Sequence, residues 1–379
     1  LKEAYEAANP NVTIEMVDLG STDYMTVLAT ELSGSGSDFD VVTIKDVPGY
    51  ATLVQKNTLE SLDDYITDAG INLADFNGIT DQVTVDGSLY ELPFRSDYWL
   101  IYYNKDVFDA AGIAYPSNDM TMEDYDALAR QLTDTTYGSQ VYGCHYHTWR
   151  SAVELFGILD GKHSILDGNY DWMIPYYDMI LSEEDDGVCQ TYTDLSTEGL
   201  HYSAAFSNGN VAMMNMGSWF ISTLISNLDS GEYDSSLCGN WGIASYPHPD
   251  GAEAGSTIAT ITGLAVTSAS ANKDAAFDFV NWVSGTEGAK VMASTGNFPA
   301  IMTDDVINTI AGMAGFPTDE GSKEALNITN AYLEVPYAEN VSEINSILDT
   351  YHTSIMNREV TVEEGVASMN EQVGKILNQ

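Results

Sequence analysis

An α/β fold is predicted by two observations: strand-like and helix-like segments alternate, and the composition is that of a chain able to bury a core. Residues 39–44 (FDVVTI) form a continuous β-branched run, typical of a buried strand in a parallel sheet. Val12, Ile14 and Met16 alternate with polar residues, as in a half-buried strand. Helix-like segments follow both, which is the βαβ rhythm of the α/β class.

The helices after these two strands are indicated by their terminal residues. Ser21 or Thr22 is expected to cap a helix that ends near Gly34. Pro48 suits the first turn of the next helix, because its missing amide hydrogen is not needed there.

Capping boxes mark two later helices. Residues 121–124 form one with Asp in place of the usual Glu, and residues 361–364 form a complete one. Asn272 and Gly285 are expected to open and end a third helix. The apolar stripes expected to face the core are Tyr125, Leu128, Ala129 and Leu132; Ala276, Phe279, Val280 and Val283; and Val362, Val366, Met369, Val373 and Ile376.

Composition excludes several function classes. The chain has 379 residues, of which 57 are Asp or Glu and 13 are Lys or Arg, giving a net charge of −44. Binding to nucleic acid or to an anionic lipid surface needs clustered basic residues, so neither is expected. Hydrophobic residues make up 44%, which excludes a disordered acidic tail. The length suffices for two or three domains.

Residues 1–8 are expected to form a helix with Leu1, Ala4, Tyr5 and Ala8 on one face, ending before Pro10. We expect any export signal or lipid anchor to lie upstream of this helix. No apolar run approaches the ~18 residues of a membrane span.

The three cysteines, Cys144, Cys189 and Cys238, allow one bridge with three possible pairings. Three unpaired thiols are the favoured interpretation. None of the three has CxxC or metal-ligand spacing.

Enzyme motifs are missing from the sequence. It contains no phosphate-binding loop, dinucleotide-binding glycine pattern, nucleophile elbow or HExxH motif. His145 and His147 could join a third ligand around a metal, but a plain loop is favoured. The acidic run at residues 183–186 is interpreted as a solvated loop rather than a calcium site. No catalytic residue, cofactor or metal is therefore expected.

Aromatic residues are the feature of the sequence that indicates a binding function. The chain has 23 Tyr and 6 Trp, and several of them lie at predicted strand ends or loop-to-helix junctions. Ligands of α/β proteins bind beyond the carboxyl ends of strands. An aromatic face there can stack on a sugar ring while Asp, Asn and Arg bond the hydroxyl groups.

Four blocks of the sequence carry a resemblance to a known family. They are AYEAANPNVTIEMV near the start, residues 38–66 (DFDVVTIKDVPGYATLVQKNTLESLDDYI), residues 90–113 (YELPFRSDYWLIYYNKDVFDAAGI) and residues 206–219 (FSNGNVAMMNMGSW). Together they resemble the family 1 extracellular solute-binding proteins, the sugar-capturing components of ABC importers. Two further stretches support the match, which covers nearly the whole chain in the family's order.

The resemblance implies a periplasmic-binding-protein type II fold, with two α/β lobes, a ligand cleft between them and a hinge crossed by several chain segments. By this analogy the N-terminal lobe comprises residues 1–103 and 258–302, and the C-terminal lobe comprises residues 104–257 and 303–379. The family's first strand and following loop would precede Leu1.

The resemblance also implies ligand-binding residues, by comparison with maltose-binding members of the family. Asp97 falls on a sugar-binding acidic residue, and Asp46 is similar to a ligand-contacting aspartate. Tyr146 and Trp219 fall on stacking aromatics. From the residues themselves, we add Trp149 and Arg95 as candidate contacts. If residues 98–102 form a strand, at most one of Tyr98 and Trp99 faces the ligand.

Departures from the family pattern argue against maltose specificity. Two stacking tryptophans of the maltose binders fall on Ile44 and Asn345, and a cleft glutamate falls on Cys144. The sugar itself is therefore not predicted, although a short oligosaccharide of hexose or pentose units is preferred over a monosaccharide.

The expected function is capture of a sugar and its delivery by hinge closure to ABC permease subunits. The acidic charge resembles that of cell-surface lipoproteins of Gram-positive gut bacteria, so we expect an extracellular monomer that meets the membrane only through a lipid anchor. Two alternatives stay open: a secreted glycoside hydrolase, and a solute-binding protein for a non-sugar ligand such as a polyamine.

Overall fold

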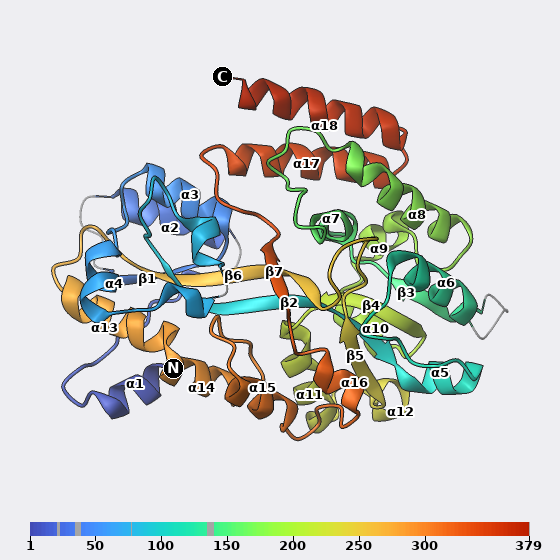
Figure 1. Ribbon diagram of the computed structural model, residues 1–379, viewed down its shortest axis with the longest axis horizontal. Coiled ribbons are helices and arrows are strands. Elements are labelled where there is room, and N and C mark those ends of the chain that lie inside the picture. The colour runs from blue at the N-terminus through green and yellow to red at the C-terminus, as the bar shows by residue number, and fades with distance from the viewer. Residues whose placement is uncertain (21–22, 35–38, 77, 135–139, 379) are drawn as a thin grey trace. The chain divides into compact units, whose positions relative to one another are not determined.

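The chain forms two compact units in a computed structural model, which describes residues 1–20, 23–34, 39–76, 78–134 and 140–378 (Figure 1). Ser21 and Thr22, the expected helix caps, lie outside the described residues. Unit 1 comprises residues 1–97, 259–313 and 335–342. Unit 2 comprises residues 98–258, 314–334 and 343–379.

Unit 1 is built from helices around a short stretch of sheet. Its elements are α1 (Lys2–Ala8), α2 (Tyr24–Ser33), β1 (Val41–Ile44), α3 (Val47–Gln55), α4 (Asp63–Ala69), the 3₁₀ turns η1 (Leu73–Phe76) and η2 (Thr80–Val83), α13 (Lys273–Ser284), α14 (Thr286–Ala293) and α15 (Asp304–Ala311). It shares β2 (Leu92–Asn104) and β6 (Ser256–Val266) with unit 2.

The strand β1 pairs antiparallel with β6, from Val41 opposite Val266 to Ile44 opposite Gly263. The expectation of a parallel neighbour is therefore wrong for the described strands. The burial of β1 alternates, with Val42 and Ile44 facing the core, so its β-branched run reflects strand propensity more than burial on both faces. The helices α2 and α3 pack beside β1 (Figure 1).

The strand expected at Val12 to Met16 does not form. No strand is assigned there, and Met16 is 76% exposed. The backbone amide of Val12 instead donates to the carbonyl of Asn9, and that of Ile14 to Glu6 Oε1 at 2.7 Å. The alternation of apolar residues was therefore insufficient to predict a strand, because the amides of Val12 and Ile14 bond locally rather than to a neighbouring strand.

Unit 2 is larger and contains most of the sheet. Its elements are α5 (Lys105–Ala111), α6 (Met122–Leu132), β3 (Tyr142–His145), α7 (Ser151–Ile158), η3 (Asp171–Met173), α8 (Ile174–Asp185), α9 (Tyr192–Glu198), α10 (Tyr202–Ser207), β4 (Val211–Gly217), α11 (Trp219–Ser230), α12 (Ser235–Cys238), β5 (Trp241–Ser245), α16 (Glu320–Glu324), β7 (Asn330–Leu333) and α18 (Val362–Leu377), and α17 (Val341–Met356) begins at its boundary with unit 1.

The core of unit 2 lies around β4, whose seven residues are all buried. β4 pairs antiparallel with β2 and parallel with β3, and β5 pairs with the other side of β2. The helix α6 packs against β3 and β4, while α7 and α8 pack on each other (Figure 1). The strand predicted at residues 98–102 is thus confirmed as part of β2.

Helix caps are the best-predicted local features. The capping boxes of α6 and α18 both form, with Thr121 and Thr361 accepting from the third helical amide. Every residue of the stripe predicted for α18 is buried. In α13 the buried phenylalanine is Phe277, while Phe279 is half-buried against Tyr5 of α1.

The acidic run at residues 183–186 is not a solvated loop, and this expectation is wrong. Residues 183–185 form the last turn of α8, and Glu183 and Glu184 are buried. Glu184 accepts a hydrogen bond from the amide of Tyr192 and pairs with Arg358. Helical periodicity turns two of the four acidic side chains inward, which residue type alone did not reveal.

The chain passes between the two units after Asp97, Ile258, Met313, Glu334 and Ser342. The sequence-based expectation placed these passages after residues 103, 257 and 302. That the two units act as functional lobes remains a prediction. Residues 303–313 and 335–342 belong to unit 1. None of the helices among the described residues combines the length and the apolar character that a membrane crossing needs.

Candidate ligand-binding site

The carboxyl ends of β3 and β4 bring together aromatic residues of unit 2. The two strands are parallel, with Cys144 beside Met213, so both end at the same edge of the sheet. His147 and Trp149 follow β3, and Trp219 follows β4. This is the edge at which open α/β sheets bind ligands.

Trp219 is held at this edge by the turn that ends β4. The amide of Ser218 donates to the carbonyl of Tyr98 at 2.8 Å, and the amide of Tyr98 donates to Ser218 Oγ at 3.2 Å. The indole ring folds back over Gly217, where an added Cβ would lie 2.0 Å from a ring carbon. Only glycine at position 217 leaves room for the ring.

Three tryptophans form the centre of an aromatic cluster. Trp99 on β2 meets Trp219 with ring centroids 5.6 Å apart, and Trp149 with centroids 6.4 Å apart, both at nearly right angles. Trp149 and Trp219 lie 6.2 Å apart. Edge-to-face contacts of this kind are favourable beyond area burial and fix the ring planes.

His147 and Tyr202 complete the cluster. His147 lies 4.5 Å from Trp149 and 5.4 Å from Tyr202, between ring centroids. Burial, with the nearby His201, lowers the pKa of His147 to about 4, so its ring is neutral at pH 7. Trp149 is 39% exposed, so the aromatic cluster formed by Trp99, His147, Trp149, Tyr202 and Trp219 presents an open face without a positive charge.

A buried ionic network lies next to Trp149 in the chain. Arg150 Nε pairs with Glu154 at 2.5 Å, and its other nitrogens bond Asp349 and Asn345. Fixing Arg150 fixes the backbone beside Trp149. Glu334 lies nearby, bonded to the hydroxyl of Ser151, and burial raises its pKa to about 7.

Tyr146, expected to stack on a sugar, is 5% exposed. Its ring packs against Tyr125 and Phe156 in the core of unit 2. The neighbouring His147, not Tyr146, lies in the aromatic cluster, because successive side chains after a strand point to opposite sides. The structure therefore brings Trp149 and Trp219 together and leaves Tyr146 behind them.

Asp46 in unit 1 follows β1 directly, as expected, and is exposed. It caps α3, with its carboxylate accepting from the amide of Gly49 at 2.7 Å. Because a carboxylate has several acceptor sites, the cap leaves Asp46 able to accept further bonds from solvent or a ligand.

Arg95 and Asp97 lie on the unit 1 part of β2, two residues apart and so on one face of the strand. Arg95 Nε pairs with Asp97 Oδ2 at 2.6 Å, and Asp97 is 5% exposed. The pair places a carboxylate and a guanidinium side by side, which is a set able to bond sugar hydroxyls as acceptor and donor.

Glu91, which sequence reasoning missed, is buried in unit 1 near Asp46. Burial and the charge of Asp46 raise its pKa to about 8. An added Cβ on Gly263 of β6 would lie 2.1 Å from Glu91 Oε2, so glycine makes room for this carboxyl. Glu91 is therefore a neutral acid at pH 7 within the core of unit 1.

Two departures from the family pattern have structural roles here. Ile44 is a core residue at the end of β1, and Asn345 accepts from Arg150 at 2.6 Å. Neither contributes an aromatic ring to the cluster.

The sequence missed His147 and Tyr202 as cluster members and left Trp99 undecided. A signal for Trp99 was present, because it lies two residues after Asp97 and so shares its strand face. Tyr202 had no signal, since only the tertiary packing of α10 brings it beside Trp219.

The comparisons with known proteins agree with this fold. Residues 1–290 match the family described as bacterial extracellular solute-binding protein. The chain belongs to this family, and it is thus a solute-binding protein with the two-lobed fold rather than an enzyme.

One similar solved structure is that of a sugar transporter from Rhizobium etli in an open conformation. It is 47% identical, with a TM-score of 0.91, and the match covers 98% of this chain and 94% of that one. An ABC substrate-binding protein from Listeria monocytogenes in complex with cycloalternan is 21% identical, with a TM-score of 0.80. The match covers 100% of this chain and 94% of the Listeria chain. At that identity the second likeness shows the fold alone.

A mannitol-binding protein from Pseudomonas aeruginosa is 23% identical over 77% of this chain and 67% of its own length. Putative binding proteins of Brucella are 27% identical over 56% of this chain, and the match spans about half of their length, 52%. The ligands named for the Pseudomonas and Listeria proteins differ, so membership in the family does not name a sugar.

Proposed function

We propose that this protein captures an extracellular sugar, preferentially a short oligosaccharide, and delivers it to the permease of an ABC importer. The observation that carries the proposal is the aromatic cluster at the carboxyl ends of β3 and β4. Its ring planes are fixed by edge contacts, and Trp149 leaves one face open. The 47% identity to a protein described as a sugar transporter supports the same ligand class.

The chemistry of the cluster favours a neutral, hydroxylated ligand. Indole faces stack on the apolar faces of sugar rings, and the neutral His147 can donate or accept one hydroxyl bond. Trp149 and Trp219 are partly exposed whereas Trp99 is buried, so the cluster offers two ring positions, which supports an oligosaccharide over a monosaccharide.

We propose that the ligand-binding residues are Trp149 and Trp219 in unit 2 with Asp46, Arg95 and Asp97 in unit 1. Tyr146 is proposed to act from behind, by supporting the backbone of His147. A ligand held by residues of both units would favour a closed arrangement, because only that arrangement makes all of the contacts. The units would then act as the two lobes, and the permease would recognise the closed form.

We further propose that the protein works as a monomer on the surface of a Gram-positive bacterium, held by a lipid anchor. The family's extracellular location supports this, as does the net charge of −44, which is typical of acidic surface lipoproteins. Palmitate labelling of the full-length precursor in its host would test for the anchor. A precursor that takes up no palmitate would overturn this part of the proposal.

Calorimetric titration against a panel of di- to tetrasaccharides, with a monosaccharide, mannitol and a polyamine included, tests the ligand class. We expect binding at micromolar or tighter Kd to at least one oligosaccharide, recovered unchanged afterwards. Binding of the polyamine alone would overturn the sugar proposal, and consumption of the sugar would favour the hydrolase.

Variants then test the site. Trp149→Ala and Trp219→Ala are each expected to weaken binding about thirtyfold, which corresponds to the ~2 kcal/mol loss typical of a central aromatic contact. Trp172→Phe is the matched control, because Trp172 packs against His163 and Tyr170 outside the cluster.

A further inference from the structure

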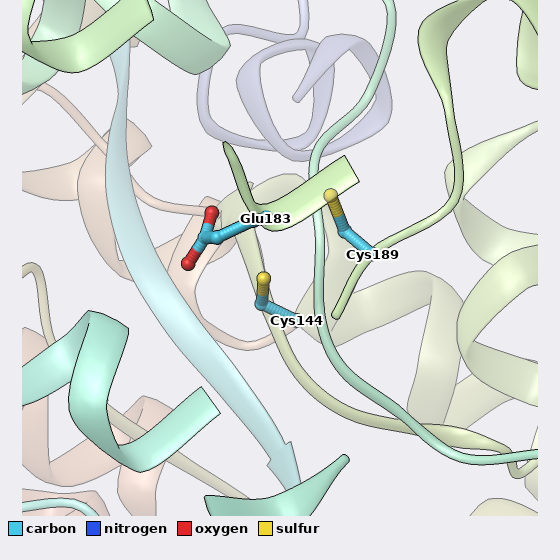
Figure 2. Close-up of side chains that lie close together, drawn as sticks. All are labelled: Cys144, Glu183 and Cys189. Carbon is cyan, nitrogen blue, oxygen red and sulfur yellow. The ribbon is translucent and has the colours of Figure 1, made fainter. Parts of the chain in front are cut away.

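Three ligand-type side chains meet in the core of unit 2, away from the aromatic cluster (Figure 2). Cys144 lies on β3, Glu183 in the last turn of α8, and Cys189 in the loop that follows. Their two sulfur atoms and a carboxylate oxygen all lie within 4.8 Å of one another, and all three residues are buried. Within the described ranges, no other group of three His, Cys, Asp or Glu side chains has this property.

The backbone holds this group in place. α8 ends in a turn at Gly187, whose φ of +70° suits glycine. The amide of Val188 donates back to the carbonyl of Glu183 at 2.8 Å, and the amide of Cys144 donates to the carbonyl of Val188 at 3.4 Å. The loop is thus folded back over the end of α8, which brings Cys189 close to both Glu183 and Cys144.

Glu183 is a second and independent sign of a site. Its side chain is fully buried, and neither carboxylate oxygen has a hydrogen bond of normal geometry, although the side chains of Tyr146 and Asp126 both interact with it. The hydroxyl of Tyr146 also lacks one, although it interacts with both Glu183 and Cys144. A buried carboxyl without such bonds is costly unless something else satisfies it.

We propose that Cys144, Glu183 and Cys189 bind one zinc-type divalent metal ion, with the Tyr146 hydroxyl or a water in the fourth position. Two thiolates, a carboxylate and one further oxygen form a tetrahedral set that suits zinc, while thiolate ligands disfavour magnesium and calcium. The ligand atoms need to move together by less than about 1 Å, given the spacing of zinc ligands.

The proposed binding of the ion balances in charge and in protons. Each thiol and the carboxyl group loses its proton on binding, so up to three protons are released for each ion. The three anionic ligands and the dication leave a net charge of −1 on the site.

The bound ion would join β3 to the end of α8, directly behind the segment that carries His147 and Trp149. Binding would stabilise unit 2, because an ion that binds the folded chain and not the unfolded chain raises the melting temperature. This proposal does not depend on the identity of the sugar, so either can fail without the other.

The test begins with the full chain after dialysis against a chelator and then against zinc. We expect one equivalent of zinc per chain by elemental analysis and a higher Tm than in the metal-free protein. Cobalt(II) should give the visible bands of a tetrahedral site and a sulfur-to-cobalt charge-transfer band. Thiol titration should find no more than one reactive cysteine in the folded, loaded protein, because Cys238 is itself buried, and three after unfolding in chelator.

Variants locate the ion. Cys144→Ser, Cys189→Ser and Glu183→Gln should each lower cobalt affinity at least tenfold, and Glu183→Gln keeps the shape of the side chain if the cysteine variants fold poorly. Cys238→Ser is the matched control, since Cys238 is buried near Asp234 and outside the group.

Two results would overturn the proposal. The first is three free thiols with no uptake of zinc or cobalt. The second is a Cys144–Cys189 disulfide, seen as a mass lower by two hydrogens and a single thiol in denaturant.

Discussion

The indole nitrogen of Trp219 donates a hydrogen bond of 3.1 Å to the hydroxyl of Tyr202. The bond joins the first residue of α11 to the first residue of α10, two helices that flank β4. Trp219 therefore cannot rotate without losing a bond and its contact with Trp99. The proposed site begins with its largest ring already held in one orientation, which lowers the entropy that ligand binding must overcome.

Removal of this hydrogen bond should weaken sugar binding without changing the fold. Tyr202→Phe keeps the ring beside His147 but loses the hydroxyl, so we expect Kd to rise about threefold to tenfold, as for one ordinary hydrogen bond. Calorimetry with the identified sugar measures this. Tyr115→Phe is the control, because its hydroxyl bonds Asp109 at an exposed position outside the cluster. Equal losses in the two variants would contradict the role given to Tyr202.

Gly217 should tolerate no side chain. In Gly217→Ala the new methyl group would meet the ring of Trp219, so the ring must swing out of the cluster. We expect a lower Tm and binding weakened at least as much as in Trp219→Ala. Gly374→Ala in α18 is the matched control, since nothing lies within 4 Å of its added Cβ, and it should raise stability slightly. An unchanged affinity in Gly217→Ala would show that the ring's position is unimportant.

Glu91 should make the stability of the protein fall as pH rises. Its pKa is raised to about 8 in the folded chain, from an ordinary value of 4.5. Between these values the folded state holds a proton that the unfolded state has lost, so the free energy of unfolding decreases by up to about 1.4 kcal/mol per pH unit. Urea unfolding from pH 5 to pH 8 should show a smaller loss in Glu91→Gln than in the wild type, where the loss from Glu91 adds to that from other buried carboxyl groups such as Glu334.

The control for this experiment is Glu343→Gln, because Glu343 is exposed at the start of α17. Its pH profile should match that of the wild type. If Glu91→Gln kept the full pH dependence, the neutral buried carboxyl inferred for unit 1 would be wrong.

Arg150 should be the most damaging single charge to remove. Arg150→Ala leaves Glu154 buried without its partner. We expect the free energy of unfolding to fall by about 3–5 kcal/mol, as is typical when one partner of a buried ion pair is removed. Lys375→Ala, at an exposed pair with Glu371, should cost less than about 0.5 kcal/mol. Urea unfolding of the two variants measures the loss in free energy of unfolding that each substitution causes. Similar losses would mean that the buried network contributes no more than a surface pair.

Local features of the fold were predictable from the sequence because the interactions that fix them are local. The capping boxes at Thr121 and Thr361 need only residues three positions apart, and the stripe of α18 needs only helical periodicity. The pairing of β1 was not predictable, because the antiparallel partner β6 lies more than 200 residues away. The apolar alternation at Val12 and Ile14 likewise says nothing about whether a partner strand exists.

The candidate site was predictable only in part, for the same reason. Trp219 was indicated by the resemblance to a stacking tryptophan of the family, and Trp149 was added from the residues themselves. Tyr202 becomes their neighbour through the packing of α10, and Tyr146 turns into the core because its backbone direction is set by β3. The Cys144, Glu183 and Cys189 group joins a strand to a helix end, so no spacing rule for metal ligands could have found it.

The most direct test of the central claim is a crystal structure of the protein with the sugar that calorimetry identifies. We expect a sugar ring stacked on Trp149 or Trp219, with hydroxyl groups bonded to Asp97 or Asp46. A sugar bound elsewhere, with the aromatic cluster left exposed to solvent, would contradict it.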